Sequence, residues 1–257
     1  MNIKRSVASF AMLALSATAS AAEIWTHAFP QTGQLKWNNF DSSSTAVNVG
    51  KTDAPAVTYG GSGGQFRGYF YTDGAASEDE FFRFFCLDLF QNATAGPLTY
   101  QASIYGNDKL ARLFDIAYPN KALGDFYDGA ATDFGKFGSG VSSSAFQLAV
   151  WEVFYETEGN FSMVGGTFKS NTVPNHNGSE AQKAVAQADA WLDLIDAGQG
   201  SASGWTLYKF TNDRQQDYLT AIYRPTPQAD TPVPEPGTLA MLGLGIAALG
   251  AIRRRRR

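Results

Sequence analysis

The chain has very few of the side chains on which most catalytic and metal-binding sites depend. Its 257 residues include one cysteine, Cys86, and two histidines, His27 and His176, which stand far apart in the sequence. A single cysteine cannot form a disulfide within the chain, and no Cys-x-x-Cys or His-x-x-x-His pair is present to bind zinc. No glycine-rich phosphate loop and no obvious acid/base pair of carboxylates is found either. We therefore expect no catalytic residues, no metal, no cofactor and no turnover enzyme, and a secreted hydrolase is the least favoured class.

Positive charge is also scarce between the two ends of the chain. Seven of the 20 Lys and Arg residues are Lys4, Arg5 and the five terminal arginines, whereas all 24 acidic residues lie between these ends. Residues 23–236 therefore have 13 basic side chains against 24 acidic ones, a net charge of −11. A surface of this charge repels polyanions, so we expect no nucleic-acid partner.

Residues 1–22 have the composition of a secretory signal peptide. Lys4 and Arg5 form a short basic region, an apolar stretch follows, and Ala19-Ser20-Ala21 supplies the small residues that a signal peptidase recognises. The apolar stretch is too short to span about 30 Å of hydrocarbon as a permanent helix. We therefore expect the chain to be exported and cleaved by signal peptidase.

The C-terminal end, residues 237–257, predicts a single hydrophobic helix. Its apolar run from Leu239 to Ile252 is followed by five arginines in succession. A helix over residues 237–252 would be only about 24 Å long, which is short for a permanent anchor. The arginines would keep this end on the cytoplasmic side, so we expect the tail to anchor the chain transiently in the inner membrane. Residues 226–236 form a proline-rich linker between the body and this tail.

This end resembles a PEP-CTERM sorting signal. The motif Pro234-Glu235-Pro236 precedes the apolar run, and the basic cluster at the very end is made of Arg253, Arg254, Arg255, Arg256 and Arg257. The resemblance implies a Gram-negative bacterium that produces exopolysaccharide, and an exosortase that removes the tail near the motif. The protein would then reside on the cell surface or in the extracellular matrix. A plain C-terminal anchor is the alternative.

Residues 23–225 are expected to form one secreted α+β body. Their content of aromatic residues, Gly, Ser and Thr favours a β-rich fold of antiparallel sheets or a barrel, with three inserted helices. The expected strands cover residues 65–72 and 80–91, with a hairpin of 205–211 and 218–223; residues 41–64 are expected to be rich in turns, with one short strand around 56–59. The expected helices cover residues 108–118, a segment capped by Ser143 or Ser144, and a segment from the capping box at Ser179 to Gly198.

The lone cysteine lies in the aromatic strand "EFFRFFCLDLFQ". A buried Cys86 that packs as a small hydrophobic side chain is the simplest interpretation. A second segment, "SAFQLAVWEVFYE", places Gln147 and Trp151 four residues apart on one face of a helix. A glutamine on such an apolar helix needs hydrogen-bond partners or access to water.

Together, Phe85-Cys86 and the segment from Gln147 to Trp151 resemble the paired motifs of bacterial surface thioester domains of the TQXA type. This resemblance extends over residues 65–225 and implies a covalent bond between the Cys86 sulfur and the Gln147 side-chain carbonyl, formed with release of ammonia. Phe146 departs from the family, which most often has threonine there. The aromatic residues expected to keep water from such a bond are Phe82, Phe84, Trp151 and Tyr155.

Two functions follow for the body. The first is a surface or matrix protein that attaches covalently to surface amines through a Cys86–Gln147 thioester. The second is a structural or binding protein of the biofilm matrix that holds exopolysaccharide without a covalent bond. For the second, the candidate sugar-binding aromatic residues are Trp37, Tyr69, Tyr71 and Trp205.

Overall fold

The computed structural model describes residues 29, 31–41, 44–72, 81–121, 135–157 and 159–224. The predicted signal peptide, linker, sorting motif and C-terminal helix lie outside these residues. Among the helices that are described, none is both long and apolar enough to cross a membrane.

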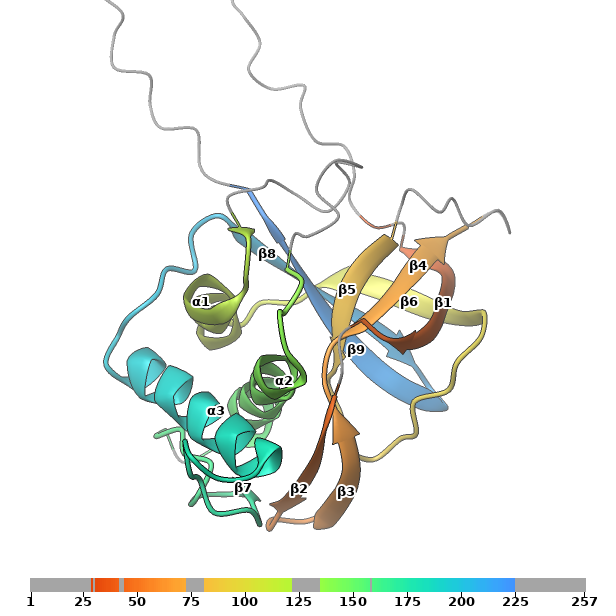
Figure 1. Cartoon of the computed structure of the whole chain (residues 1–257). Coiled ribbons are helices and arrows are strands. Elements are labelled where there is room, and N and C mark those ends of the chain that lie inside the picture. The colour runs from red at the N-terminus through yellow and green to blue at the C-terminus, as the bar shows by residue number, and fades with distance from the viewer. Residues whose placement is uncertain are drawn as a thin grey trace, which may run out of the picture.

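Six antiparallel strands close into a barrel, in the order β1-β4-β5-β9-β8-β6 (Figure 1). The strands are β1 (Thr32–Phe40), β4 (Phe66–Tyr71), β5 (Phe81–Cys86), β6 (Leu98–Ile104), β8 (Trp205–Asn212) and β9 (Gln215–Tyr223). The expected β-rich body with a barrel and three helices is confirmed. The hairpin of β8 and β9 is also confirmed. Its strands extend further toward the turn than expected, since the pairing continues as far as Asn212 and Gln215.

The strand β5 is buried on both of its faces. Phe82 faces the barrel interior, where its ring centroid lies 5.3 Å from that of Phe210, and Phe84 lies on the same face. Phe85 points the other way and packs against Phe146 of a helix at 4.6 Å. The aromatic run "FFRFFC" is thus explained by a strand between a barrel core and a helical layer. The expected strand over 80–91 is too long, because β5 ends at Cys86 and the chain bends at residues 89–91.

Three helices lie together on one side of the barrel (Figure 1). They are α1 (Asp108–Ala117), α2 (Gly140–Tyr155) and α3 (Glu180–Asp196). The helix α2 packs against both of the others and against β5, and nearly all of its residues are buried. A helix that is apolar on every side is stable only when it is enclosed in this way. The capping box at Ser179 of α3 is confirmed.

The expected cap of α2 at Ser143 or Ser144 is wrong, since Ser139 caps the helix. Ser143 and Ser144 lie within α2, and their hydroxyl groups bond to strand backbone instead. The Ser143 Oγ accepts from the Gln65 N at 2.8 Å, and the Ser144 Oγ accepts from the Thr45 N at 2.8 Å. These serines therefore fix the helix to the chain that enters β2 and β4, which local sequence could not reveal.

A second, three-stranded sheet has the order β3-β2-β7. Its strands are β2 (Thr45–Lys51), β3 (Val57–Gly63) and β7 (Phe168–Ser170). The expectation of turns with one short strand in residues 41–64 is therefore wrong for most of this segment. The many glycines suggested turns, but Val47 and Val49 alternate with exposed residues and bury one face of β2, as in a strand.

Candidate functional site

Gln147 meets Cys86 where the barrel strand β5 passes beside α2. The Gln147 Oε1 accepts a hydrogen bond from the Cys86 N at 2.8 Å, and the Gln147 Nε2 donates to the Cys86 O at 2.7 Å. The Gln147 side chain has no exposed surface, and that of Cys86 is 7% exposed. One side-chain amide therefore pairs with both backbone groups of one residue, as a neighbouring strand would.

The strand pairing explains why these backbone groups need a side-chain partner. On one edge of β5, Cys86 is paired with Tyr218 of β9. On the other edge, the pairing with β4 extends only as far as Phe84, which lies opposite Phe66. The amide of Gln147 occupies the position that β4 leaves at Cys86. A buried glutamine and two buried backbone groups thus satisfy one another, which removes the cost of burying each of them.

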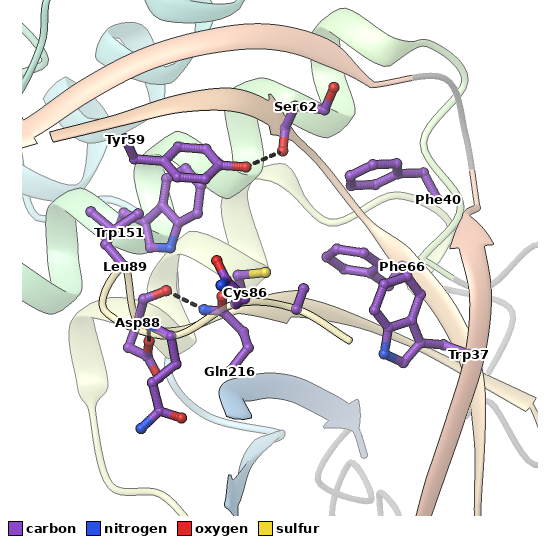
Figure 2. A pocket seen from close by; sticks show the side chains of 13 residues that line it. Trp37, Phe40, Tyr59, Ser62, Phe66, Cys86, Asp88, Leu89, Trp151 and Gln216 are labelled. Atoms are coloured by element: carbon purple, nitrogen blue, oxygen red, sulfur yellow. Dashed lines mark hydrogen bonds between the residues drawn. The ribbon is translucent and has the colours of Figure 1, made fainter. Parts of the chain in front are cut away.

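The Cys86 sulfur points into a pocket of about 420 Å³ (Figure 2). The sulfur belongs to a free, buried thiol. Aromatic side chains form much of the wall, and amide, carboxyl and hydroxyl groups lie among them. The lining residues are Trp37, Phe40, Tyr59, Ser62, Phe66, Cys86, Asp88, Leu89, Gln91, Asn92, Ala93, Trp151 and Gln216.

Trp151 and Tyr59 cover the side of the pocket next to Gln147. Trp151 lies one helical turn after Gln147 and is 2% exposed, and the Tyr59 ring stands edge-on to it with centroids 5.5 Å apart. The Tyr59 hydroxyl donates to the Ser62 O at 2.8 Å, which holds the ring across the pocket (Figure 2). Gly63 lies against the same side chains, since a Cβ there would be in ordinary van der Waals contact, at 3.5 Å, with both the Gln147 Cγ and the Trp151 ring.

The chain after Cys86 is fixed by the carboxylate of Asp88. This carboxylate accepts hydrogen bonds from the backbone N of Phe90 and of Gln91, each at 3.2 Å, and from the N of Asp217 at 2.9 Å. The Asp88 backbone carbonyl accepts from the Gln216 side chain (Figure 2). Asp88 therefore connects the segment after β5 to the start of β9 through its hydrogen bonds.

Of the four residues expected to shield a thioester, only Trp151 lines the pocket, and the other three lie elsewhere. Phe82 and Phe84 belong to the barrel interior and do not line it, although Phe84 stacks on the pocket residue Phe66 at 5.5 Å. Tyr155 lies behind the turn, where its hydroxyl accepts from the Leu89 N at 2.7 Å. Phe84 and Tyr155 support walls of the pocket from behind, and their shielding role stays a prediction.

Three of the expected sugar-binding residues lie elsewhere. Trp205 is 8% exposed and packs on Tyr223 with centroids 4.8 Å apart, so it offers no open face. Tyr69 and Tyr71 are half-buried on β4 away from the pocket, and only Trp37 lines it. The sequence reasoning overlooked the roles of Tyr59 and Gln216 at this pocket, because their relation to Cys86 arises only from the barrel closure and the second sheet.

The surroundings of Cys86 keep its thiol neutral. Burial raises the pKa of the Cys86 thiol well above 9.0, and the nearby Asp88 carboxylate raises it further. No histidine or lysine is found among the described residues that line the pocket. A neutral thiol beside a neutral amide fits either a buried structural cysteine or the two partners of a thioester, and it does not fit a reactive thiolate nucleophile.

Comparison with known proteins gives one match, at the C-terminal end. Residues 232–257 match the PEP-CTERM protein-sorting motif. The match indicates an exported surface protein that an exosortase processes, as expected from Pro234-Glu235-Pro236 and the terminal arginines. No curated protein and no solved structure matches the chain significantly, so no relative supports the resemblance to thioester domains.

Proposed function

We propose that this exported surface protein forms a thioester between the Cys86 Sγ and the Gln147 Cδ, and uses it once to attach covalently to an amine outside the cell. The observation that carries the proposal is the pair of hydrogen bonds between the Gln147 amide and the Cys86 main chain. These bonds hold the amide carbon, which is bonded to both Oε1 and Nε2, against the residue that supplies the sulfur. The PEP-CTERM match supports a surface location, where such attachment would be useful.

The formation step uses only these two side chains. The Cys86 sulfur attacks the Gln147 Cδ, a C–S bond forms, and the C–N bond to Nε2 breaks. The thiol proton passes to Nε2, which leaves as ammonia. In the tetrahedral intermediate the oxygen gains negative charge, and the Cys86 N–H, already 2.8 Å from Oε1, is in position to stabilise it.

The pocket provides the protection that a stored electrophile needs. Trp151 and Tyr59 restrict water on the side next to Gln147, and the Cys86 side chain is nearly buried. Exclusion of water slows hydrolysis and leaves the thioester for an amine that enters from the open side. The amine nitrogen bonds to Cδ, the C–S bond breaks, and one amine proton passes to the sulfur. The product is an amide at Gln147 and a free Cys86 thiol.

Intact-mass spectrometry of the exported protein tests the proposal. A thioester lowers the mass by about 17 Da, one ammonia, and leaves no thiol to alkylate in the native protein. Cys86→Ala and Gln147→Ala should each abolish the mass loss. Gln65→Ala is the matched control, because Gln65 is also fully buried and bonded to backbone, but its partner is the Gly135 O and not Cys86. A full-mass protein with an alkylatable Cys86 refutes the thioester.

The second candidate is a matrix protein that binds polysaccharide without a covalent bond. Trp37 favours it, because this half-buried indole lines the pocket beside several amide side chains. A full-mass protein that binds oligosaccharides in a Trp37-dependent manner would support this function in place of the first.

A further inference from the structure

Among the described residues that line the pocket beside Cys86, none is suited to remove a proton from a strongly basic amine. Asp88 is the only carboxylate among its described lining residues, and no His or Lys lines it. Both Asp88 oxygens already accept backbone hydrogen bonds, from Phe90 and Gln91 on one oxygen and from Asp217 on the other. A lysine amine has a pKa of about 10.4 and is almost fully protonated at neutral pH, so it would enter in an unreactive form.

Two buried polar atoms of the lining residues have no hydrogen-bond partner among the described residues. They are the Trp151 Nε1–H, which needs an acceptor, and the Gln91 Oε1, which needs a donor. An ammonium group only donates hydrogen bonds, so it can pair with the Gln91 Oε1 but not with the indole N–H. A hydroxyl group both donates and accepts, so it suits either atom.

Aromatic rings at two sides of the pocket favour a ligand with flat apolar faces. Trp37 comes from β1, with its ring edge-on to Phe66 at 4.7 Å, and Tyr59 comes from β3. A volume of about 420 Å³ lies within the usual range of small-molecule sites and exceeds what one unbranched alkylamine would fill. A sugar ring combines apolar faces with hydroxyl groups around its edge.

We propose that the amine captured by the Cys86–Gln147 pair is the free amino group of an amino sugar in a polysaccharide, held between Trp37 and the Tyr59–Trp151 side of the pocket. This inference rests on the proposed thioester. The amine of an amino sugar has oxygen substituents on the neighbouring ring carbons, which make it less basic than the amine of lysine. A larger fraction of it is therefore unprotonated at neutral pH, and its reaction needs no base in the pocket. The net charge of −11 of residues 23–236 also attracts a polysaccharide with protonated amino groups.

The attachment step balances without another reactant. The neutral sugar amine attacks the Gln147 Cδ, its nitrogen forms the C–N bond, and the bond from Cδ to the Cys86 sulfur breaks. One amine proton is transferred to the departing sulfur, which ends as the Cys86 thiol. The sugar remains joined to the protein as an N-substituted glutamine amide.

Competition between amine probes tests the inference on the exported protein. The probes are a β-1,4-linked glucosamine trimer, Nα-acetyl-lysine methylamide, and glycinamide, which is weakly basic but has no sugar ring. At equal concentration and pH 7.5, the trimer should form adducts about tenfold faster than either of the others, as measured by intact mass. Trp37→Ala should remove this advantage, whereas Tyr71→Ala, outside the pocket lining, should keep it. Equal or faster reaction with the lysine probe or with glycinamide overturns the proposal.

A binding measurement separates this inference from the thioester itself. Cys86→Ala cannot form the bond but keeps the pocket, so tryptophan fluorescence should still report binding of the glucosamine trimer. Binding by Cys86→Ala without any mass loss in the parent protein would refute the thioester, and with it covalent capture, while showing that the pocket recognises sugar. A mass loss in the parent without sugar binding by Cys86→Ala would refute the amino-sugar target alone.

Discussion

The side-chain amide of Gln147 forms two hydrogen bonds with the main chain of Cys86, at 2.8 Å to its N–H and at 2.7 Å to its carbonyl. The amide thereby continues the barrel pairing at the point where β4 no longer accompanies β5. The same contact places the Gln147 carboxamide next to the one cysteine of the chain. The structural role of this pair of residues and the chemical role that we propose for it thus depend on the same contact.

The first prediction concerns the stability provided by this contact. Gln147→Ala should lower the free energy of unfolding by about 2–4 kcal/mol, because it leaves two buried backbone groups of Cys86 without partners. Urea unfolding of the Cys86→Ala background measures this cost without any contribution from a thioester. Gln101→Ala, at an exposed position on β6, should cost less than about 0.5 kcal/mol. A Gln147→Ala cost as small as that of the control would show that the two bonds contribute little.

The second prediction concerns the titration of Cys86. After hydroxylamine opens the thioester, alkylation of the thiol should be slow at pH 8 and should still increase in rate above pH 9. The reason is that burial and the Asp88 carboxylate raise the thiol pKa well above 9.0, so the thiolate is rare below that pH. The rate of iodoacetamide labelling against pH measures this. A rate that levels off near pH 8 would mean that the thiol is exposed and normally acidic.

The third prediction concerns protection of the thioester by Tyr59. Tyr59→Ala should speed hydrolysis of the bond about tenfold, because it removes the half-buried ring that stands against Trp151 without emptying the barrel core. The mass of the protein followed over time reports hydrolysis as a gain of one water. Tyr71→Ala serves as the control, since Tyr71 does not line the pocket. An unchanged hydrolysis rate in Tyr59→Ala would show that the Tyr59 ring does not protect the thioester from water.

The fourth prediction concerns Glu152, a fully buried carboxyl group on α2. Its pKa is raised to about 9, mainly by burial and also by the carboxylates of Glu156, Asp189 and Asp196, despite a hydrogen bond from the Ser162 N. Between pH 4.5 and about 9 the unfolded chain releases this proton and the folded chain keeps it. The contribution of Glu152 to stability therefore falls as the pH rises through this window and is constant on either side of it.

Glu152→Gln removes this titration while it keeps a neutral group of the same shape. The variant should be more stable than the parent at pH 8, by about 1–3 kcal/mol, and the difference should shrink toward pH 4.5. Thermal or urea unfolding across this range measures it. A variant less stable than the parent at pH 8 would show that Glu152 is ionised in the folded protein.

Local sequence patterns were sufficient for the parts of the fold that depend on neighbours along the chain. The capping box at Ser179 and the hairpin of β8 and β9 are set by residues within a few positions of one another. The cap of α2 was misplaced because Ser143 and Ser144 bond to backbone about 80 and 100 residues away, at Gln65 and Thr45. The strands β2 and β3 were missed for the same reason. Their glycines predict turns when only neighbouring residues are considered, whereas the strands depend on pairing within the second sheet.

The proximity of Cys86 and Gln147 was predicted only through the resemblance to thioester domains. No periodicity links residues 61 positions apart, and the contact depends on β4 ending its pairing before Cys86. The walls of the pocket were less predictable still, since Trp37, Tyr59 and Gln216 come from three different strands. Aromatic residues are common in this barrel, and sequence alone could not separate Phe82, which fills the core, from Tyr59, which faces the pocket.

Peptide mapping of the exported protein tests the central claim most directly. After proteolysis under mildly acidic conditions without reductant or amine, the peptide that contains Cys86 and the peptide that contains Gln147 should be recovered as one cross-linked species. Its mass should be about 17 Da below the sum of the two peptides, because one ammonia has left. Hydroxylamine should separate the two peptides. Recovery of two unlinked peptides, with an unmodified Gln147 amide and a free Cys86 thiol, would contradict the account.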